Sequence, residues 1–471
     1  MNEALKRSVL GWRYGGYIFS VAGARTAGIL ISSLTFPYLL RRLGVEAYGQ
    51  WSYVVALCAL LNVIADPGMN LFLTQHVAAR RKSAFETIPD VLFLRLITSL
   101  ITGLALLAIT SRETQGNVRE LLYLYGIGIL FVNLVAADHL LGALELFHAR
   151  SLLTVMQQLL YALMVFIFVR STRNLIWLPI SILSSSMASA LVAWIILWRN
   201  GLRFRARLRP ACWRGILRPS LHYAGSSLMS NIYHRAGHLL VRWFLGDFAL
   251  GIYAAAVRFV EILRGFVITG LQVLMPRIAA AANSAPELRR LARLATSIIA
   301  ILSIPLTVGL IGTAHLMVPW VLGTKYLADV ELLRWMAPYL ITASAASLFS
   351  GTILFAVGRY RAYFASTASG ALAGVFLYVT LIPFWGLRGA ALAFVSAELI
   401  VAVVALARIP EIHGSWKNSV FWIAPASALL MIFAIKLANS YTSQAMVVVL
   451  VGACVYAMSC GWFVRRLFAQ A

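Results

Sequence analysis

Residues 17–40 read YIFSVAGARTAGILISSLTFPYLL, a run in which Arg25 is the only charged side chain. A helix of about 20 apolar residues crosses the hydrocarbon core of a bilayer, so this run is long enough for one span. Lys6, Arg7 and Arg13 precede the run, and no small-residue cleavage site follows it. The run is therefore predicted to be an uncleaved first transmembrane helix rather than a signal peptide.

Apolar runs of this length recur along the whole chain. Hydrophobic residues make up 61% of the 471 residues and charged residues 12%, and the mean hydropathy is +0.83. Soluble domains are about 45–50% apolar and about 25% charged, so this composition is that of a membrane protein. The runs are continuous rather than alternating, which predicts helices and excludes a transmembrane β-barrel. Spans are predicted at 17–40, 49–73, 91–110, 121–141, 152–169, 175–198, 221–245, 251–275, 294–313, 332–357, 361–383, 386–407, 419–437 and 444–464.

About fourteen spans leave only short connectors between them. No connector reaches the roughly 50 residues of a small soluble domain, which excludes a separate catalytic or nucleotide-binding domain. The predicted fold class is an all-α polytopic membrane protein with about 14 transmembrane helices. The four cysteines form no C-x-x-C pair and no zinc-type spacing, so neither a disulfide framework nor a metal site is predicted.

The chain carries 40 Lys and Arg against 16 Asp and Glu, a net charge of +24. In a soluble protein this charge would point to nucleic acid, but in a membrane protein basic residues mark the cytoplasmic loops. The loop charges predict a cytoplasmic N-terminus, an even number of spans returns the C-terminus to the same side, and no nucleic-acid partner is expected. The densest basic run, expected to contact anionic lipid head groups, is Arg199, Arg203, Arg205, Arg207, Arg209, Arg214 and Arg218.

A short motif occurs twice, with an offset of 202 residues. Leu43-Gly44, Ala47 and Gly49 in the first copy match Leu245-Gly246, Ala249 and Gly251 in the second. Each copy opens an even-numbered span. Six spans separate them, so the two halves enter the membrane in the same direction, and parallel repeats of this kind commonly hold the substrate at their interface. This predicts two parallel six-helix lobes around a central cavity, at 1–198 and 221–410, joined by a basic cytoplasmic linker at 199–220 and followed by two additional helices at 411–471.

Several motifs, in this order and spacing, resemble the polysaccharide (Wzx-type) flippases of the multidrug/oligosaccharidyl-lipid/polysaccharide exporter superfamily. The resemblance implies a two-lobed bundle of 12 to 14 helices in the bacterial inner membrane. It also implies translocation of an undecaprenyl-diphosphate-linked oligosaccharide, and other polysaccharide-assembly membrane proteins as partners. The motifs are Phe36-Pro37-Tyr38-Leu39 running into Leu43-Gly44 and Tyr48-Gly49, Ala65-Asp66-Pro67-Gly68, Leu245-Gly246 through Gly251-Ile252-Tyr253-Ala254-Ala255-Ala256, Met275-Pro276, and Gly386-Leu387-Arg388-Gly389-Ala390-Ala391-Leu392-Ala393.

Charged side chains inside the predicted spans are the candidate functional residues. A charge at the bilayer centre costs about 2.5–3.5 kcal/mol on insertion scales, so it should face a cavity or a partner. The second span carries Asp66 and the eighth carries Glu261. Arg95 lies near a span end and is expected to extend to the membrane surface. The basic residues within the spans are Arg25 in the first, Arg235 and Arg242 in the seventh, and Arg258 and Arg264 in the eighth.

Two interpretations of these charges remain open. In the first, Asp66 and Glu261 form structural ion pairs with Arg25 and Arg235, because the members of each pair lie at similar predicted depths. In the second, the charges line one cavity. Five arginines against two acids leave a surplus of positive charge, and the planar guanidinium binds phosphate oxygens in a bidentate manner. The second interpretation predicts that Arg25, Arg235, Arg258 and Arg264 hold the substrate diphosphate. The full set of predicted substrate-binding residues is Arg25, Asn231, Arg235, His238, Arg242, Arg258 and Arg264.

Glu398 is a lone acid in the apolar twelfth span. A buried carboxyl can carry a proton or bind a sodium ion, and members of the superfamily couple transport to such ions. Asp66, Glu261 and Glu398 are therefore expected to serve in ion coupling or in structural pairing. H⁺ or Na⁺ is the expected coupling ion, with no other cofactor.

The main functional hypothesis is a flippase that moves an O-antigen or exopolysaccharide repeat unit from the cytoplasmic to the periplasmic leaflet by alternating access. No bond is made or broken, so the protein is not predicted to be an enzyme. A lipid II flippase would also use an arginine-lined cavity. A multidrug exporter would favour an acidic or aromatic cavity. A membrane polymerase or ligase would need a large external loop, whereas the longest predicted one, roughly 314–331, is modest.

Overall fold

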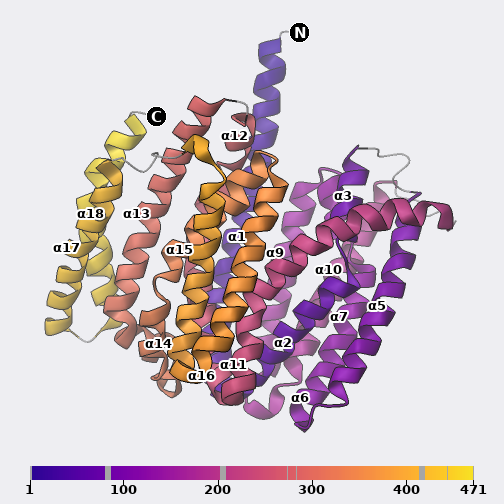
Figure 1. Ribbon diagram of the computed structural model, residues 1–471, viewed down its shortest axis with the longest axis horizontal. Helices are drawn as coiled ribbons and strands as arrows, with labels where there is room; N and C mark the ends of the chain where they lie inside the picture. The colour runs from indigo at the N-terminus through magenta and orange to yellow at the C-terminus, as the bar shows by residue number, and fades with distance from the viewer. Residues whose placement is uncertain are drawn as a thin grey trace. The chain divides into compact units, whose positions relative to one another are not determined.

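The computed structural model describes residues 3–79, 86–201, 208–272, 274–282, 284–412, 419–442 and 444–469. Within these ranges all regular secondary structure is helical (Figure 1). This confirms the predicted all-α class. The chain divides into two compact units. Unit 1 holds residues 1–43 and 50–235, and unit 2 holds residues 44–49 and 236–471.

Unit 1 is a bundle of long helices and of shorter, interrupted ones. Its longest helix, α1 (Glu3–Leu43), packs along α9. The Tyr38 hydroxyl on α1 donates a 2.9 Å hydrogen bond to the carbonyl oxygen of Val169, just past the end of α9. The other elements are α2 (Val45–Ala65), α3 (Met69–Ala79), α5 (Ile88–Thr110), α6 (Gly116–Leu121), η1 (Leu122–Gly126), α7 (Ile127–Val135), α8 (Asp138–Ala143), α9 (Phe147–Phe168), η2 (Thr172–Asn174), α10 (Trp177–Arg199) and the beginning of α11 (Pro210–Gln272).

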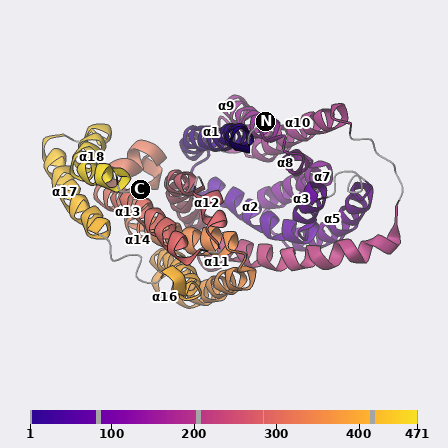
Figure 2. The same ribbon diagram turned by 90° about the horizontal axis from the view of Figure 1, so that it is seen from above.

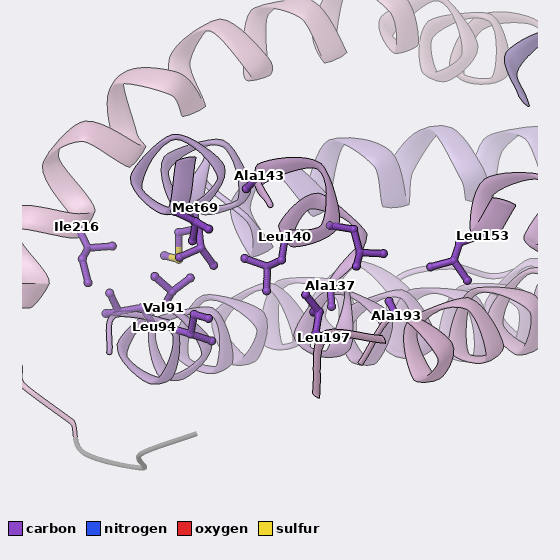
Figure 3. Close-up of a cluster of buried hydrophobic side chains, with 14 residues drawn as sticks. Met69, Val91, Leu94, Ala137, Leu140, Ala143, Leu153, Ala193, Leu197 and Ile216 are labelled. Carbon is purple, nitrogen blue, oxygen red and sulfur yellow. The ribbon is translucent and has the colours of Figure 1, made fainter. Parts of the chain in front are cut away.

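A buried apolar cluster joins six of these helices. Figure 3 shows Met69 from α3, Val91 and Leu94 from α5, and Leu140 from α8 among its members. Ile216, near the start of α11, belongs to the same cluster. Burial of each such side chain contributes about 1.5–3 kcal/mol, so the cluster holds the short helices α3 and α8 in place although neither could span a membrane alone.

Unit 2 is built around α13 (Ala285–Met317) and α16 (Tyr360–Ala407). Helices α17 (Ser419–Tyr441) and α18 (Ala445–Ala469) pack on each other and on α13, as both Figure 1 and Figure 2 show. The remaining elements are the rest of α11, α12 (Met275–Ala280), η3 (Val318–Leu322), η4 (Thr324–Tyr326), α14 (Asp329–Met336), α15 (Tyr339–Ala346), η5 (Ser347–Leu354) and η6 (Pro410–Ile412).

The predicted spans fall on these helices, with some differences. Helices α11 and α16 each contain two predicted spans, joined at a glycine in the left-handed region: Gly246 with φ 85° and Gly386 with φ 55°. The second predicted span is interrupted at residues 66–68 and continues as α3 to Ala79. Among the described residues, eight helices are long and apolar enough to cross a membrane, or nine if the bent pair α14–α15/η5 counts as one. The protein is thus a multi-pass membrane protein, and the number fourteen stays a prediction.

The two copies of the repeated motif pack against each other. Gly44 (φ 75°) and Gly246 (φ 85°) occupy equivalent turns. A Cβ added to Gly49 would overlap the backbone carbonyl oxygen of Asp247, and a Cβ added to Gly251 would overlap that of Val45. Val45 and Asp247 are themselves separated by the 202-residue offset. The two contacts are therefore equivalent, since in each one a glycine of one copy meets the backbone of the other copy. Glycine is required at both positions because only a residue without a Cβ allows such close backbone approach.

Candidate functional site

The second helix of unit 1 is broken in its middle. Helix α2 ends at Ala65, α3 begins at Met69, and Gly68 between them has a φ of 78°. A break of this kind leaves backbone groups without their helical partners. Two side chains satisfy them. The Thr98 hydroxyl donates to the Ala65 carbonyl oxygen at 2.6 Å, and the Asp66 carboxylate accepts the backbone N–H of Asn70 at 3.3 Å.

A second break lies beside the first. Helix α7 ends at Val135 and α8 begins at Asp138, and α8 packs against α3. The freed carbonyl oxygen of Val135 accepts a 2.8 Å hydrogen bond from the indole N–H of Trp194 on α10. Unit 1 therefore places two discontinuous helices side by side, an arrangement that membrane transporters use to bring polar groups to mid-membrane depth.

The polar side chains at these breaks form one group, which we call the broken-helix cluster: Asn62, Asp66, Asn70, Arg95 and Asn133. Arg95 is only 1% exposed and lies 3.9 Å from Asp66 in an ion pair. Its guanidinium donates to the side-chain oxygen of Asn70 and, at 3.5 Å, to the backbone carbonyl oxygen of Asn133. The Asn133 amide in turn donates to Asn62. The cluster is neutral overall, because Arg95 and Asp66 balance each other.

The cluster corrects the expectation for Arg95, which does not extend to the membrane surface. The broken helix provides the reason. It carries Asp66 and Asn70 into the bundle, where they give a buried guanidinium the partners that it needs. The ion-pair partner that the structure shows for Asp66 is Arg95. Asp66 also caps α3, and a carboxylate at a helix N-terminus is stabilised by the helix dipole.

In unit 2, Arg264 on α11 is held by two neutral hydroxyls. Its guanidinium donates to the Tyr339 hydroxyl at 2.8 Å and to the Ser347 hydroxyl at 3.3 Å. The guanidinium carbon also lies 5.8 Å from the centre of the Tyr339 ring. Tyr339 is stacked at 4.2 Å on Phe394 of α16. These contacts leave the positive charge of Arg264 without a carboxylate hydrogen-bonded to it among the described residues.

Glu398 and two tyrosines lie in the same region of unit 2. The hydroxyls of Tyr253 and Tyr378 are 2.8 Å apart, and the His238 ring makes an edge contact with Tyr253. Glu398 is 4% exposed and lies close enough to Arg264 and Tyr378 to interact electrostatically with both. We call these residues the α11–α16 network: His238, Tyr253, Arg264, Tyr339, Tyr378 and Glu398.

The remaining predicted arginines differ in how they are paired. Arg242 forms a 2.7 Å ion pair with the buried Asp247 across the Gly246 kink. Arg258 lies 3.9 Å from Glu261 and is 46% exposed, which makes that pair weak. Arg235 has no hydrogen bond or ion pair within the described part of the chain and is partly exposed.

Arg25 and Asn231 lie on the helices predicted for them. Arg25 is exposed on α1, and Asn231 is half-buried on α11. Both make interactions with other parts of the protein. Among the described residues, no group of three or more His, Cys, Asp or Glu could hold a metal ion. The assignment of the substrate-binding residues stays a prediction.

The basic linker is anchored to unit 1 where it is described. Arg209 donates to Glu86 at 2.8 Å, and its backbone N–H donates to the fully buried Asp90 at 2.7 Å. The indole N–H of Trp213 donates to the same carboxylate at 3.0 Å. Arg214 and Arg218 on α11 are exposed. Arg203, Arg205 and Arg207 lie outside the described residues.

Four residues of these two groups, and the pairing role of Arg95, were not predicted from the sequence: Asn133, Tyr253, Tyr339 and Tyr378. The tyrosines sit in apolar spans, where an aromatic residue is ordinarily core. No local sequence pattern distinguishes these tyrosines from other core tyrosines, because they come together only when the chain is folded. The helix break at Asp66-Pro67-Gly68 was the available signal for Arg95, because such a break needs polar partners.

Comparison with known proteins places the chain in a family. The sequence model described as "Polysaccharide biosynthesis protein" matches residues 17–282, more than half of the chain. The chain belongs to the polysaccharide biosynthesis protein family. This confirms the resemblance to Wzx-type flippases.

Two curated relatives are named putative O-antigen transporters. The one from Escherichia coli (strain K12) is 23% identical over 279 residues, which cover 59% of this chain and 65% of the relative. The one from Shigella dysenteriae is 21% identical over 393 residues, 83% of this chain and 97% of the relative. The chain thus spans less than two thirds of the first relative and nearly all of the second. Both are transporters and not enzymes, as the sequence of this chain also predicted.

Solved structures share the fold. A lipid II flippase MurJ in an inward closed conformation matches with a TM-score of 0.78 and 14% identity, covering 96% of this chain and 99% of that one. An inward-facing multidrug resistance MATE transporter of the MOP superfamily matches with a TM-score of 0.64 and 17% identity, over 84% and 99% of the two chains. At these identities the likeness shows the fold alone.

Proposed function

We propose that the protein is a flippase for an undecaprenyl-diphosphate-linked oligosaccharide, an O-antigen or exopolysaccharide repeat unit. It carries this lipid from the cytoplasmic to the periplasmic leaflet of the bacterial inner membrane by alternating access. The observation that supports this most directly is the family match, together with two relatives named as putative O-antigen transporters. In this proposal both termini are cytoplasmic, and other polysaccharide-assembly membrane proteins are partners.

The charges of the described residues fit an anionic substrate. Asp66 and Asp247 are paired within the protein, whereas Arg235 in unit 1 has no such partner and Arg258 in unit 2 has only a weak one. Positive charge is therefore available in each unit. The planar guanidinium of an arginine can donate two parallel hydrogen bonds to the oxygens of a diphosphate. We propose that Arg235 and Arg258, with Arg25, bind the diphosphate. The paired Arg242 and the hydroxyl-bound Arg264 hold the helices in place instead.

A complementation experiment tests the function. The full chain is expressed in one bacterial strain that lacks its O-antigen transporter and in another that is depleted of its lipid II flippase. We expect restored surface polysaccharide in the first strain and no rescue of growth in the second. The fold likeness to MurJ makes the second strain the necessary comparison. Rescue of the second strain alone would assign the protein to cell-wall precursor transport.

Glu398 is the proposed coupling residue of the α11–α16 network, with H⁺ or Na⁺ as the ion. It is buried and interacts electrostatically with Arg264. Glu398→Gln keeps the size of the side chain but cannot ionise, so it should abolish the ion dependence of transport while leaving substrate binding nearly intact. The measurement is transport in proteoliposomes under imposed proton and sodium gradients. Glu331→Gln is the control, because Glu331 pairs with Arg388 at an exposed site, and it should keep the ion dependence. Transport by Glu398→Gln with unchanged ion dependence would make Glu398 structural.

A further inference from the structure

A buried carboxyl in unit 2 has no partner within the described residues. Asp329 is the first residue of α14 and is 0% exposed, and neither of its carboxyl oxygens accepts or donates a hydrogen bond. The hydroxyl of Tyr326, three residues earlier in η4, is also fully buried and without a hydrogen bond. An unpaired ionised carboxylate is among the most costly groups to bury, and in practice such a group takes up a proton instead.

Within the described part of the chain, no cation forms an ion pair with the carboxyl of Asp329 to replace that proton. Tyr326 interacts electrostatically with Asp329 and with Tyr48, and burial raises the pKa of Tyr326, so its hydroxyl stays neutral. Helices α13 and α16 pack against α14. The charged or titratable groups on or beside these elements are engaged elsewhere or turned to the surface. His315 of α13 bonds to Asn439, Arg388 of α16 pairs with Glu331 at an exposed site, and Lys325 and Arg334 are exposed.

Glu398 is the acid of α16, the helix that packs on α14, but it lies too far along α16 to share this site. It is twelve residues past the Gly386 kink, about 18 Å at 1.5 Å per residue. Arg388, which contacts α14 through Glu331, is only two residues past the kink. The carboxyl of Asp329 is therefore separate from the α11–α16 network.

Asp329 lies at one end of a bent pair of helices. Helices α14 and α15 meet at a 40° bend at Ala337 and Pro338 and, taken as one bent span, are long and apolar enough to cross a membrane. The first residue after the bend, Tyr339, accepts the hydrogen bond from Arg264. The carboxyl of Asp329 is enclosed where α14 packs on α13 and α16. Because an ionised carboxylate is stabilised by water, loss of the proton favours an arrangement in which α14 is separated from these helices.

We propose that Asp329 is a proton-binding site that keeps α14 packed on unit 2 while it is protonated and releases α14 when the proton leaves. The site lies at the end of the bent span that also carries the partner of Arg264. This inference goes beyond the transport function proposed above and does not rest on it. Its test follows the protonation state of one side chain and needs no substrate.

The experiment uses infrared spectroscopy on the purified full-length protein at neutral pH. The wild-type protein should show a C=O stretching band of a protonated carboxyl. Labelling the aspartates with ¹³C should shift this band, which assigns it to an aspartate without any substitution. Asp329→Asn should remove the band. Glu331→Gln, on the same helix but exposed and paired with Arg388, should leave it unchanged.

A second measurement follows stability. Because the packed state holds the proton and the separated state releases it, raising the pH should lower the Tm of the wild-type protein. This dependence should be lost in Asp329→Asn and kept in Glu331→Gln. The absence of an aspartate band would overturn the proposal. So would a Tm that rises with sodium ion against choline and is independent of pH, since Asp329 would then be an ionised cation ligand.

Discussion

Arg235→Ala should leave the protein at its normal level in the membrane and reduce transport by about 10- to 100-fold. Arg235 forms no hydrogen bond or ion pair within the described residues, so its removal leaves no buried acid unpaired. A hydrogen bond to a charged group contributes about 1.5–3 kcal/mol, which corresponds to that loss if the guanidinium binds the diphosphate. Arg235→Lys keeps the charge but loses the planar guanidinium that donates two parallel hydrogen bonds. It should therefore reduce transport by less than Arg235→Ala does.

The measurements are surface polysaccharide in the complemented strain and the amount of protein in the membrane. Arg242→Ala is the matched control, because Arg242 lies two helical turns further along α11 and pairs with the buried Asp247 at 2.7 Å. Its removal should lower the amount of protein. Normal transport by Arg235→Ala would exclude Arg235 from substrate binding. A loss of protein that Glu261→Ala restores would show instead that Arg235 is one half of a structural ion pair.

Arg95→Ala should destabilise unit 1 severely. It removes the ion-pair partner that Asp66 has among the described residues and also leaves the side-chain oxygen of Asn70 without its donor. Breaking a buried ion pair by removing one partner costs about 3–5 kcal/mol. We expect little protein in the membrane and a markedly lower Tm in whatever is purified.

The exposed pair between Arg150 and Asp138 provides the control, with side chains 47% and 54% exposed. Arg150→Ala should cost only about 0–1 kcal/mol. The double variant Arg95→Met with Asp66→Asn should recover part of the stability, since asparagine still caps α3 and no charge remains unpaired. If Arg95→Ala were as stable as Arg150→Ala, the broken-helix cluster would not hold the two discontinuous helices together.

The spans and the repeat could be predicted because both are local. A run of about 20 apolar residues has one interpretation, and glycines at 44, 49, 246 and 251 mark the same turn twice. The charge pairs could not be predicted, because they depend on which helices are adjacent. Depth along uninterrupted helices suggested Arg25 as the partner of Asp66. The break after Ala65 changes the direction of the chain and so brings Asp66 to Arg95.

The tyrosines of the α11–α16 network show the same limit. Tyr253 and Tyr378 lie 125 residues apart and meet only because α11 and α16 pack in unit 2. Asp329 was missed for another reason. It lies in the connector predicted at roughly 314–331, three residues before the span predicted at 332–357, where an acid is ordinarily solvated. Only the packing of α13 and α16 around α14 shows that it is buried.

The crossing of the two glycine motifs has the symmetry of a contact between identical subunits. In a two-fold dimer, residue i of one subunit touches residue j of the other, and j touches i in return. Gly49 on Asp247 and Gly251 on Val45 obey this rule, with the 202-residue offset in place of the second subunit. Each copy therefore constrains the other, because a side chain added at Gly49 or at Gly251 would displace the backbone of the opposite copy.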